Sequence, residues 1–504
     1  EGPAGSGLEQ GGLELKGGVD YVGSIWTAWE KTATPVTVRL EWGEPGTKGE
    51  GAAVVQVTAP SAEWAKTELR FVNPPAVKGA RLRVVKGGEG VVRVGAVSLM
   101  PGDHVRGMRR DTLALLKELN APLYRWPGGN FVSGYEWRDG IGDRDRRPTR
   151  KNPAWRGIDS NDFGVHEFMD FCKEIGTEPL VVVNTGFGDS YSAAQWVEYM
   201  NGATATPMGS LRMRNGHPDP YGVQWWGVGN EMWGGWQLGH MALEQYTIKH
   251  NDFVKRMRQV DARIRVVGSS DLGGGWTEGM LKACAGSMDL ISEHFYCQER
   301  PGVAGHAAQV PNAIRAKAEA HRALRKKLPE LKGKDVRIAM DEWNYWYGPE
   351  VFGELGTRYF LKDALGIAAG LHEYSRCTDV VFMANYAQTV NVIGCIKTSA
   401  TQAAMETTGQ VLALYRLRFG TLPVEVRWPD GSLRAQVTRE RIQALLPWMT
   451  LDGSEDGVGA LALSDSGRLL FIAVHDSAAA PDGLPSVWVS ATAFPWRSTT
   501  VTWV

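Results

Sequence analysis

The chain has 504 residues, more than one ordinary hydrophobic core can hold, so two or three domains are expected. Its 55 basic and 56 acidic residues nearly cancel, to a formal net charge of −1, which argues against nucleic acid or a membrane surface as a partner. No apolar run approaches the roughly 18 residues that a membrane span needs, and the opening residues lack the pattern of a signal peptide. We therefore expect a soluble protein, secreted or cytoplasmic, and the compartment stays open.

The first hundred residues consist of short β-like runs separated by Gly and Pro, such as "VTVRLEWG" and "ARLRVVKG". This pattern predicts a β-sandwich over residues 1–100, similar in layout to a carbohydrate-binding module. Its tryptophans, Trp26, Trp29, Trp42 and Trp64, either form a flat platform for sugar rings or pack between the sheets, and imperfect alternation in "SIWTAWEK" favours packing.

Residues 101–420 alternate between helical and strand-like stretches, which predicts a parallel sheet and, with this many units, a (β/α)8 TIM barrel. The helical stretches include "MRRDTLALLKELN", residues 308–328, residues 358–375 and residues 401–419. Only seven strand runs are found; they are "APLYRWPGG", "PLVVVNTG", "VQWWGVGNE", "IRVVGSS", "MDLISEHFY", "VRIAMDEWN" and "DVVFMANYA". Residues 421–504 return to short strands, which predicts a C-terminal β-sandwich.

Catalytic groups of a parallel barrel lie at the C-terminal ends of its strands. Two of these ends carry a strong candidate carboxylate, Glu231 after "WWGVGN" and Glu342 in "AMDEWN". If the visible strands are numbered two to eight, Glu231 closes the fourth and Glu342 the seventh, across the barrel mouth from each other. Two opposed carboxylates are typical of glycoside hydrolases, and a separation of roughly 5 Å between them would make the enzyme retaining.

Five segments, "RWPGGNFVSGYEWRDGIG", "GVGNEMWGGWQLGH", "SEHFY", "DEWNYWY" and "ANYAQTVNVI", resemble glycoside hydrolase family 51, the α-L-arabinofuranosidases of the clan A retaining barrels. The resemblance implies that Glu231 is the general acid/base and Glu342 the nucleophile. It further implies a substrate-binding set and a supporting pair. The binding residues are Asn130, Asn230, Tyr296, Trp236 and Gln388, and the supporting residues are Arg125 and His294.

Tryptophans surround Glu231 in the sequence, so burial is expected to raise its pKa, as a general acid requires. Glu342 must stay ionised, and Tyr296 or Arg125 could stabilise its charge. The charge-dense loop at residues 142–156 could be a phosphate patch, but its interleaved acids favour a loop that is paired internally.

Five cysteines without CxxC spacing argue against a zinc site, and the histidines lack metal-ligand spacing, so neither a metal nor a cofactor is expected. The sequence predicts an exo-acting α-L-arabinofuranosidase that acts on hemicellulose or its arabinose-containing oligosaccharides. One alternative is an endo-acting glucanase or xylanase of the same clan, because the same two carboxylates serve those reactions. The other is a non-catalytic carbohydrate-binding protein. Resemblance to the family also admits a homo-oligomer.

The eighth barrel strand is missing from this count. Family 51 barrels begin with a strand that carries a further acidic residue, whereas this chain opens on "EGPAGSGLEQGG", a Gly-rich linker without an apolar run. We expect either a gap beside "APLYRWPGG" or another segment in that place, and an upstream segment that is absent from the chain.

Overall fold

The computed structural model describes residues 5–30, 35–57, 61–348 and 350–419, together with three short strands near the C-terminus. Those strands form an antiparallel sheet of β19 (Gly459–Leu463), β20 (Arg468–Ala473) and β21 (Val489–Ala493). The remainder of the C-terminal sandwich expected at residues 421–504 lies outside the described residues. Among the described helices, none is long and apolar enough to cross a bilayer.

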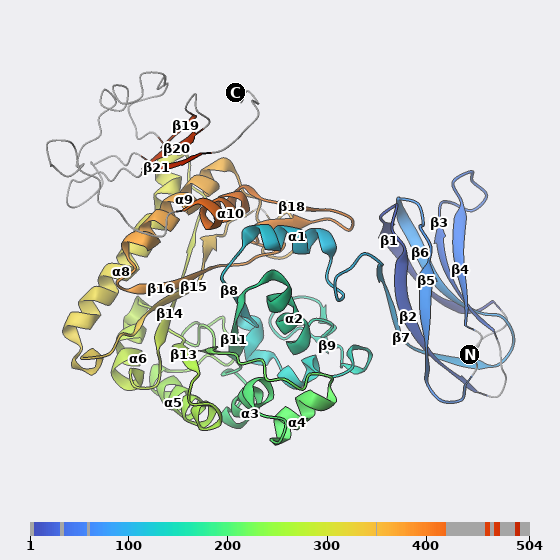
Figure 1. Ribbon diagram of the computed structural model, residues 1–504, viewed down its shortest axis with the longest axis horizontal. Helices are drawn as coiled ribbons and strands as arrows, with labels where there is room; N and C mark the ends of the chain where they lie inside the picture. The colour runs from blue at the N-terminus through green and yellow to red at the C-terminus, as the bar shows by residue number, and fades with distance from the viewer. Residues whose placement is uncertain are drawn as a thin grey trace.

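The N-terminal region consists of two antiparallel sheets in the orders β1-β6-β3-β4 and β5-β2-β7 (Figure 1). The strands are β1 (Gly7–Leu15), β2 (Tyr21–Glu30), β3 (Val36–Trp42), β4 (Gly51–Val57), β5 (Ala65–Phe71), β6 (Val77–Lys86) and β7 (Val91–Pro101). Strand β1 corrects the expectation of a linker at the N-terminus. It lies at the edge of its sheet and most of it is exposed, because pairing with β6 provides its backbone hydrogen bonds without an apolar run.

The sandwich tryptophans have different surroundings. Trp29 is buried in the core between the sheets, and Trp42 packs against that core. Trp64 is 48% exposed. Trp26 is partly buried on the other face of its sheet, where its indole nitrogen donates to Asp145 of the barrel at 2.8 Å. Packing thus accounts for Trp29 and Trp42, while Trp26 joins the sandwich to the barrel.

The charged loop at residues 142–156 is paired mainly with its surroundings, which corrects the expectation of an internally paired loop. Asp145 binds Lys66 of the sandwich as well as Trp26. Arg147 bonds Glu167 at 2.8 Å, and its side chain is only 2% exposed. Within the loop, Arg146 reaches Asp143 at 3.8 Å. The loop therefore stands between the sandwich and the barrel and bonds to both.

Seven parallel strands form a nearly closed barrel in the order β16-β15-β14-β13-β12-β11-β8 (Figure 1). They are β8 (Leu123–Trp126), β11 (Glu178–Val183), β12 (Trp225–Val228), β13 (Arg265–Gly268), β14 (Leu290–Cys297), β15 (Arg337–Tyr345) and β16 (Val381–Tyr386). Every strand run expected from the sequence is present, which confirms the barrel prediction. Among the described residues no strand pairs between β8 and β16, and the side chains of these edge strands are less buried than those of β11 to β13.

The helices expected from the sequence are all present. They are α1 (Arg110–Leu119), α2 (Val165–Ile175), α5 (Leu243–Val260), α8 (Gln309–Lys327), α9 (Leu361–Arg376) and α10 (Thr407–Arg418). The last begins later than expected, because Ala403–Met405 forms strand β18 and pairs with β17 (Ile396–Thr398) in place of a first helical turn. The pattern missed three further helices, α3 (Ser190–Asn201), α4 (Pro207–Arg214) and α6 (Trp276–Cys284), and the one-turn helix α7 (Ala304–Ala307).

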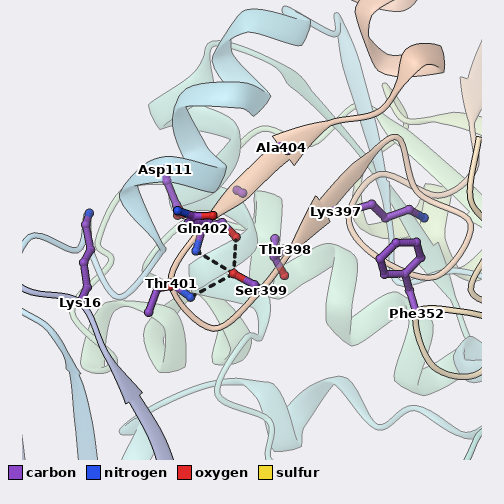
Figure 2. A pocket seen from close by; sticks show the side chains of 10 residues that line it. Lys16, Asp111, Phe352, Lys397, Thr398, Ser399, Thr401, Gln402 and Ala404 are labelled. Carbon is purple, nitrogen blue, oxygen red and sulfur yellow. Dashed lines mark hydrogen bonds between the residues drawn. The ribbon is translucent and has the colours of Figure 1, made fainter. Parts of the chain in front are cut away.

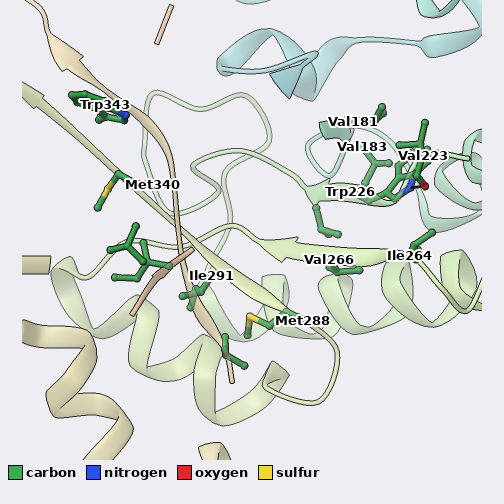
Figure 3. Close-up of a cluster of buried hydrophobic side chains, with 14 of the residues drawn as sticks. Val181, Val183, Val223, Trp226, Ile264, Val266, Met288, Ile291, Met340 and Trp343 are labelled. Atoms are coloured by element: carbon green, nitrogen blue, oxygen red, sulfur yellow. Dashed lines mark hydrogen bonds between the residues drawn. The ribbon is translucent and has the colours of Figure 1, made fainter. Parts of the chain in front are cut away.

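Alternate residues of the barrel strands enter two different cores. Val181, Val266, Ile291 and Met340 face outward and pack with Trp226 and Trp343 beneath the helices (Figure 3). The inward residues form a smaller aliphatic cluster inside the barrel; they are Leu180, Val267, Leu290 and Ala339. This cluster fills the interior below the C-terminal strand ends, where the polar side chains of the site gather.

Candidate active site

Four strands deliver the polar residues above the aliphatic layer. Arg125 comes from β8, and Asn230 and Glu231 follow β12. Ser292, His294 and Tyr296 alternate along β14 and thus share its inward face. Asp341 and Glu342 are neighbours on β15. The structure brings these residues together in one hydrogen-bonded cluster at the C-terminal ends of the strands.

Glu342 is held by donors on both of its oxygens. Arg125 donates from Nη1 to Oε1 at 2.8 Å, and the hydroxyl of Tyr296 donates to Oε2 at 2.9 Å. The side chains of Arg125 and Glu342 are 8% and 12% exposed, so water weakens their attraction little. These contacts fix the direction of both Glu342 oxygens.

Asp341 enters the same cluster because β15 carries a bulge. Ser292 pairs with Ala339 and His294 with Glu342, so β15 advances by three residues where β14 advances by two. A bulge re-aims the following side chains. Two consecutive acids would point to opposite faces of a regular strand. Here both lie against Arg125, and Asp341 Oδ2 is 3.3 Å from Arg125 Nε. Adjacent acids at a strand end were the only signal of Asp341 in the sequence.

Glu231 is placed by a turn rather than by a strand. Its backbone adopts φ 44°, and Gly229 adopts φ 81°, where an added Cβ would meet Thr185 Oγ1 at 2.0 Å. One carboxylate oxygen lies 2.8 Å from His294 Nδ1. The other accepts a hydrogen bond of 2.7 Å from the indole nitrogen of Trp236, whose ring is exposed beside the site.

The expectation for the pKa of Glu231 is corrected. Burial alone would raise it, as predicted, but the hydrogen bond and positive charge of His294, followed by the bond from Trp236 and the charge of Arg125, hold the pKa of Glu231 below its usual value. His294 arrives from a strand far along the chain, so the residues around Glu231 gave no sign of it. The surroundings of Glu231 thus favour its ionised form.

The ligand atoms of Glu231, His294 and Glu342 all lie within 4.8 Å of one another. Arg125 already presents its positive charge to Glu342, and the ring of His294 is already bonded to two carboxylates, so the cluster is satisfied internally. We therefore interpret Glu231 and Glu342 as a pair of acids with His294 hydrogen-bonded beside them, rather than as a cation site.

Of the remaining candidate residues, Asn230 lies in the cluster, whereas Asn130 and Gln388 lie outside it. Asn230 accepts from Arg125 Nη2 at 2.6 Å and donates to Gln237, so it belongs to the cluster. Asn130 uses both ends of its amide on the backbone of the loop that carries Trp236, donating to Trp236 O at 2.9 Å and accepting from Leu238 N at 2.8 Å. Gln388 lies just beyond β16, exposed, and outside the hydrogen-bonded cluster formed by the described residues.

A cavity of about 540 Å³ lies away from these carboxylates, between the sandwich and the β17–β18 hairpin (Figure 2). Lys16 lines it from the sandwich side, and Phe352 and Lys397 line it from the barrel side. Its one carboxylate, Asp111, is engaged by Arg109 at 2.6 Å. The cavity therefore lacks the paired acids of the strand-end cluster.

Known families match two parts of the chain. Residues 115–315 match the "Alpha-L-arabinofuranosidase 1 domain" and residues 341–437 the "Alpha-L-arabinofuranosidase C-terminal domain". A "Probable alpha-L-arabinofuranosidase C" of Aspergillus clavatus is 32% identical over 70% of this chain and 74% of its own. An "Intracellular exo-alpha-L-arabinofuranosidase" of Bacteroides ovatus is 32% identical over 72% and 73%. The solved GH51 α-L-arabinofuranosidase of Thermotoga petrophila superposes with a TM-score of 0.62 at 31% identity, covering 74% of this chain and 76% of that one.

Proposed function

Because the chain belongs to glycoside hydrolase family 51, the α-L-arabinofuranosidases, we propose that it removes terminal arabinofuranosyl residues from hemicellulose or its oligosaccharides with retention of configuration. The observation that carries the proposal is the spacing of Glu231 and Glu342, whose nearest oxygens lie within 4.8 Å. Retaining enzymes hold their two carboxyl groups about 5 Å apart, whereas inverting enzymes leave roughly 6.5–9.5 Å for a water molecule.

Glu342 is the nucleophile in this proposal. Its oxygens face the guanidinium of Arg125 and the hydroxyl of Tyr296, which fix the direction of the carboxylate. In the first step a Glu342 oxygen bonds to the anomeric carbon as the glycosidic bond breaks. Fixed donors of this kind need no reorganisation at the moment of reaction.

Glu231 is the general acid and then the general base. It protonates the leaving oxygen in the first step and takes a proton from water in the second, when the arabinosyl ester of Glu342 is hydrolysed. The exposed ring of Trp236 beside Glu231 offers a flat apolar surface against which a sugar can stack. Asn230, bonded to Arg125, is placed to bind a ring hydroxyl next to the nucleophile.

Exo action and an arabinose-containing substrate are supported by the relatives, of which the Bacteroides ovatus protein is named an exo-acting enzyme. The test is hydrolysis of 4-nitrophenyl α-L-arabinofuranoside beside a β-1,4-glucan and a xylan backbone. We expect turnover of the arabinoside, release of arabinose from an arabinosylated xylo-oligosaccharide, and first-formed arabinose of the α configuration by proton NMR. Activity on the polymer backbones alone would favour an endo-acting enzyme, β-arabinose as the first product would exclude retention, and sugar binding without turnover would favour a binding protein.

A further inference from the structure

His294 lies between two carboxylates and contacts both through its ring nitrogens. Nδ1 is 2.8 Å from Glu231 Oε1, and Nε2 is 3.1 Å from Asp341 Oδ1. The side chains of His294 and Asp341 are each 5% exposed. A neutral imidazole carries one N–H and can donate to only one carboxylate.

Asp341 fixes which nitrogen carries the first proton. The hydroxyl of Ser292 lies 2.5 Å from Asp341 Oδ1 and donates to it, and Arg125 Nε lies 3.3 Å from Oδ2. The bond from Ser292 and the charge of Arg125 keep Asp341 ionised. Burial opposes this, but the charge of Arg125, with the charge and bond of His294 and the bond of Ser292, lowers the pKa of Asp341. An ionised Asp341 accepts hydrogen bonds and cannot donate, so Nε2 must carry a hydrogen.

The remaining contact, from Nδ1 to Glu231, then requires a second proton. Without one, the Nδ1 lone pair would face a carboxylate oxygen at 2.8 Å, and the two acceptors would repel each other. One proton must therefore lie between His294 and Glu231. Glu342, 3.7 Å from Nδ1, adds a further negative charge that favours the imidazolium.

We propose that His294 stores the proton that Glu231 delivers to the leaving group, and that Asp341 is the positioning residue that keeps His294 charged. This inference rests on the proposed function, because it assigns the source of that reaction's acid proton. It also explains how Glu231 can be an ionised carboxylate before substrate binds and a general acid afterwards.

The proton transfers balance over one catalytic cycle. In the first half, the Nδ1 proton passes to the carboxylate of Glu231 and on to the glycosidic oxygen, which takes the electron pair of the breaking bond to the anomeric carbon while Glu342 forms the new bond. In the second half, water attacks the anomeric carbon and frees Glu342. The proton from that water passes through Glu231 back to Nδ1, so no proton is gained or lost by the enzyme.

The other charged and titratable groups around His294 agree with this assignment. Arg125 approaches from β8 but directs its nitrogens to Asp341, Glu342 and Asn230, not to the imidazole. Tyr296, on the strand of His294 itself, donates to Glu342. Burial lowers the pKa of His294, but Glu342, Asp341 and the bonds to Asp341 and Glu231 outweigh it and raise that pKa well above the usual value.

The first experiment measures the charge of His294 directly. The full chain is labelled with ¹⁵N-histidine, and the ring nitrogens of His294 are assigned by their absence from His294→Gln. At pH 7.5 we expect both nitrogens at imidazolium shifts in the wild-type protein without substrate. A neutral tautomer at that pH would overturn the proposal.

The second experiment separates proton storage from mere support of the fold. In Asp341→Asn the alkaline limb of the kcat/KM profile should move by about one pH unit or more to lower pH on an arabinosyl oligosaccharide, since the imidazolium loses its partner charge. On the 2,4-dinitrophenyl arabinoside, whose leaving group needs no proton, the alkaline limbs of variant and wild type should coincide. Alkaline limbs that coincide on the oligosaccharide would contradict the role given to Asp341.

Glu293→Gln is the matched control. Glu293 is the neighbour of His294 on β14 and is also buried, but it faces away from the site and bonds Lys317 at 2.7 Å. This variant should leave the position of the alkaline limb unchanged. If Asp341→Asn does not fold, the NMR measurement on the wild type still decides. Failure of the proposed function would instead appear as activity that survives loss of Glu342.

Discussion

The two carboxylates of the site are supported in opposite ways. Glu342 is carried by strand β15 and is bonded by a guanidinium and a phenol that do not change charge near neutral pH. Glu231 is carried by a turn with φ 44° and is bonded by an imidazole and by an exposed indole. The difference matches the two proposed roles, because a nucleophile needs a constant charge and direction, whereas an acid/base must gain and lose a proton in each cycle.

The largest effect should come from removing Glu342, the carboxylate with the fixed donors. Glu342→Ala should lower kcat/KM by roughly four to six orders of magnitude on every substrate, activated or not, because each requires the covalent intermediate. Aryl and natural arabinosides would be compared by steady-state kinetics, with circular dichroism as the control for folding. Activity on either substrate within tenfold of wild type would exclude Glu342 as the nucleophile.

Removing Glu231 should lower activity by an amount that depends on the leaving group. Glu231→Ala should lose about 10²–10⁴-fold on arabinosyl oligosaccharides but far less on a dinitrophenyl arabinoside, which needs no acid. Added azide should increase the rate and yield an arabinosyl azide with the configuration of the substrate. Equal losses on both substrates, without azide rescue, would remove the distinction between the two carboxylates.

The smallest effect should come from removing the indole ring of Trp236, which lies beside Glu231. Trp236→Ala should weaken binding and turnover by one to two orders of magnitude, about 1.5–3 kcal/mol for the loss of an aromatic surface. Trp236→Phe keeps a ring but loses the N–H that bonds Glu231, so it separates stacking from the hydrogen bond. Wild-type KM and kcat in Trp236→Ala would place this ring outside the substrate site.

The sequence predicted what depends on local periodicity. Each strand run, with the polar residue that ends it, is contiguous in the sequence. The barrel strands and the two strand-end carboxylates could therefore be predicted from the sequence alone. The bulge that turns Asp341 toward Arg125 depends on the register between β14 and β15, which no single segment contains. The pKa of Glu231 was mispredicted for the same reason, because its main partner, His294, is 63 residues away in the chain.

Two other errors have a similar origin. Strand β1 has little apolar character of its own and is a strand because β6 pairs with it. The first turn expected for α10 is replaced by β18, which pairs with β17. In both cases pairing with another strand, distant in sequence for β1 and adjacent in a hairpin for β18, outweighed the local preference of the segment.

The bonds between Asp145 and the sandwich have a consequence for acid stability. Burial opposes ionisation of Asp145, but Lys66 and Trp26, with Arg144, lower its pKa. A carboxylate with a lowered pKa stabilises the folded arrangement above its unfolded pKa, and that contribution disappears as pH falls through the folded value. Acid therefore removes the ionic part of this link, and the sandwich should be held against the barrel less firmly at low pH than at neutral pH.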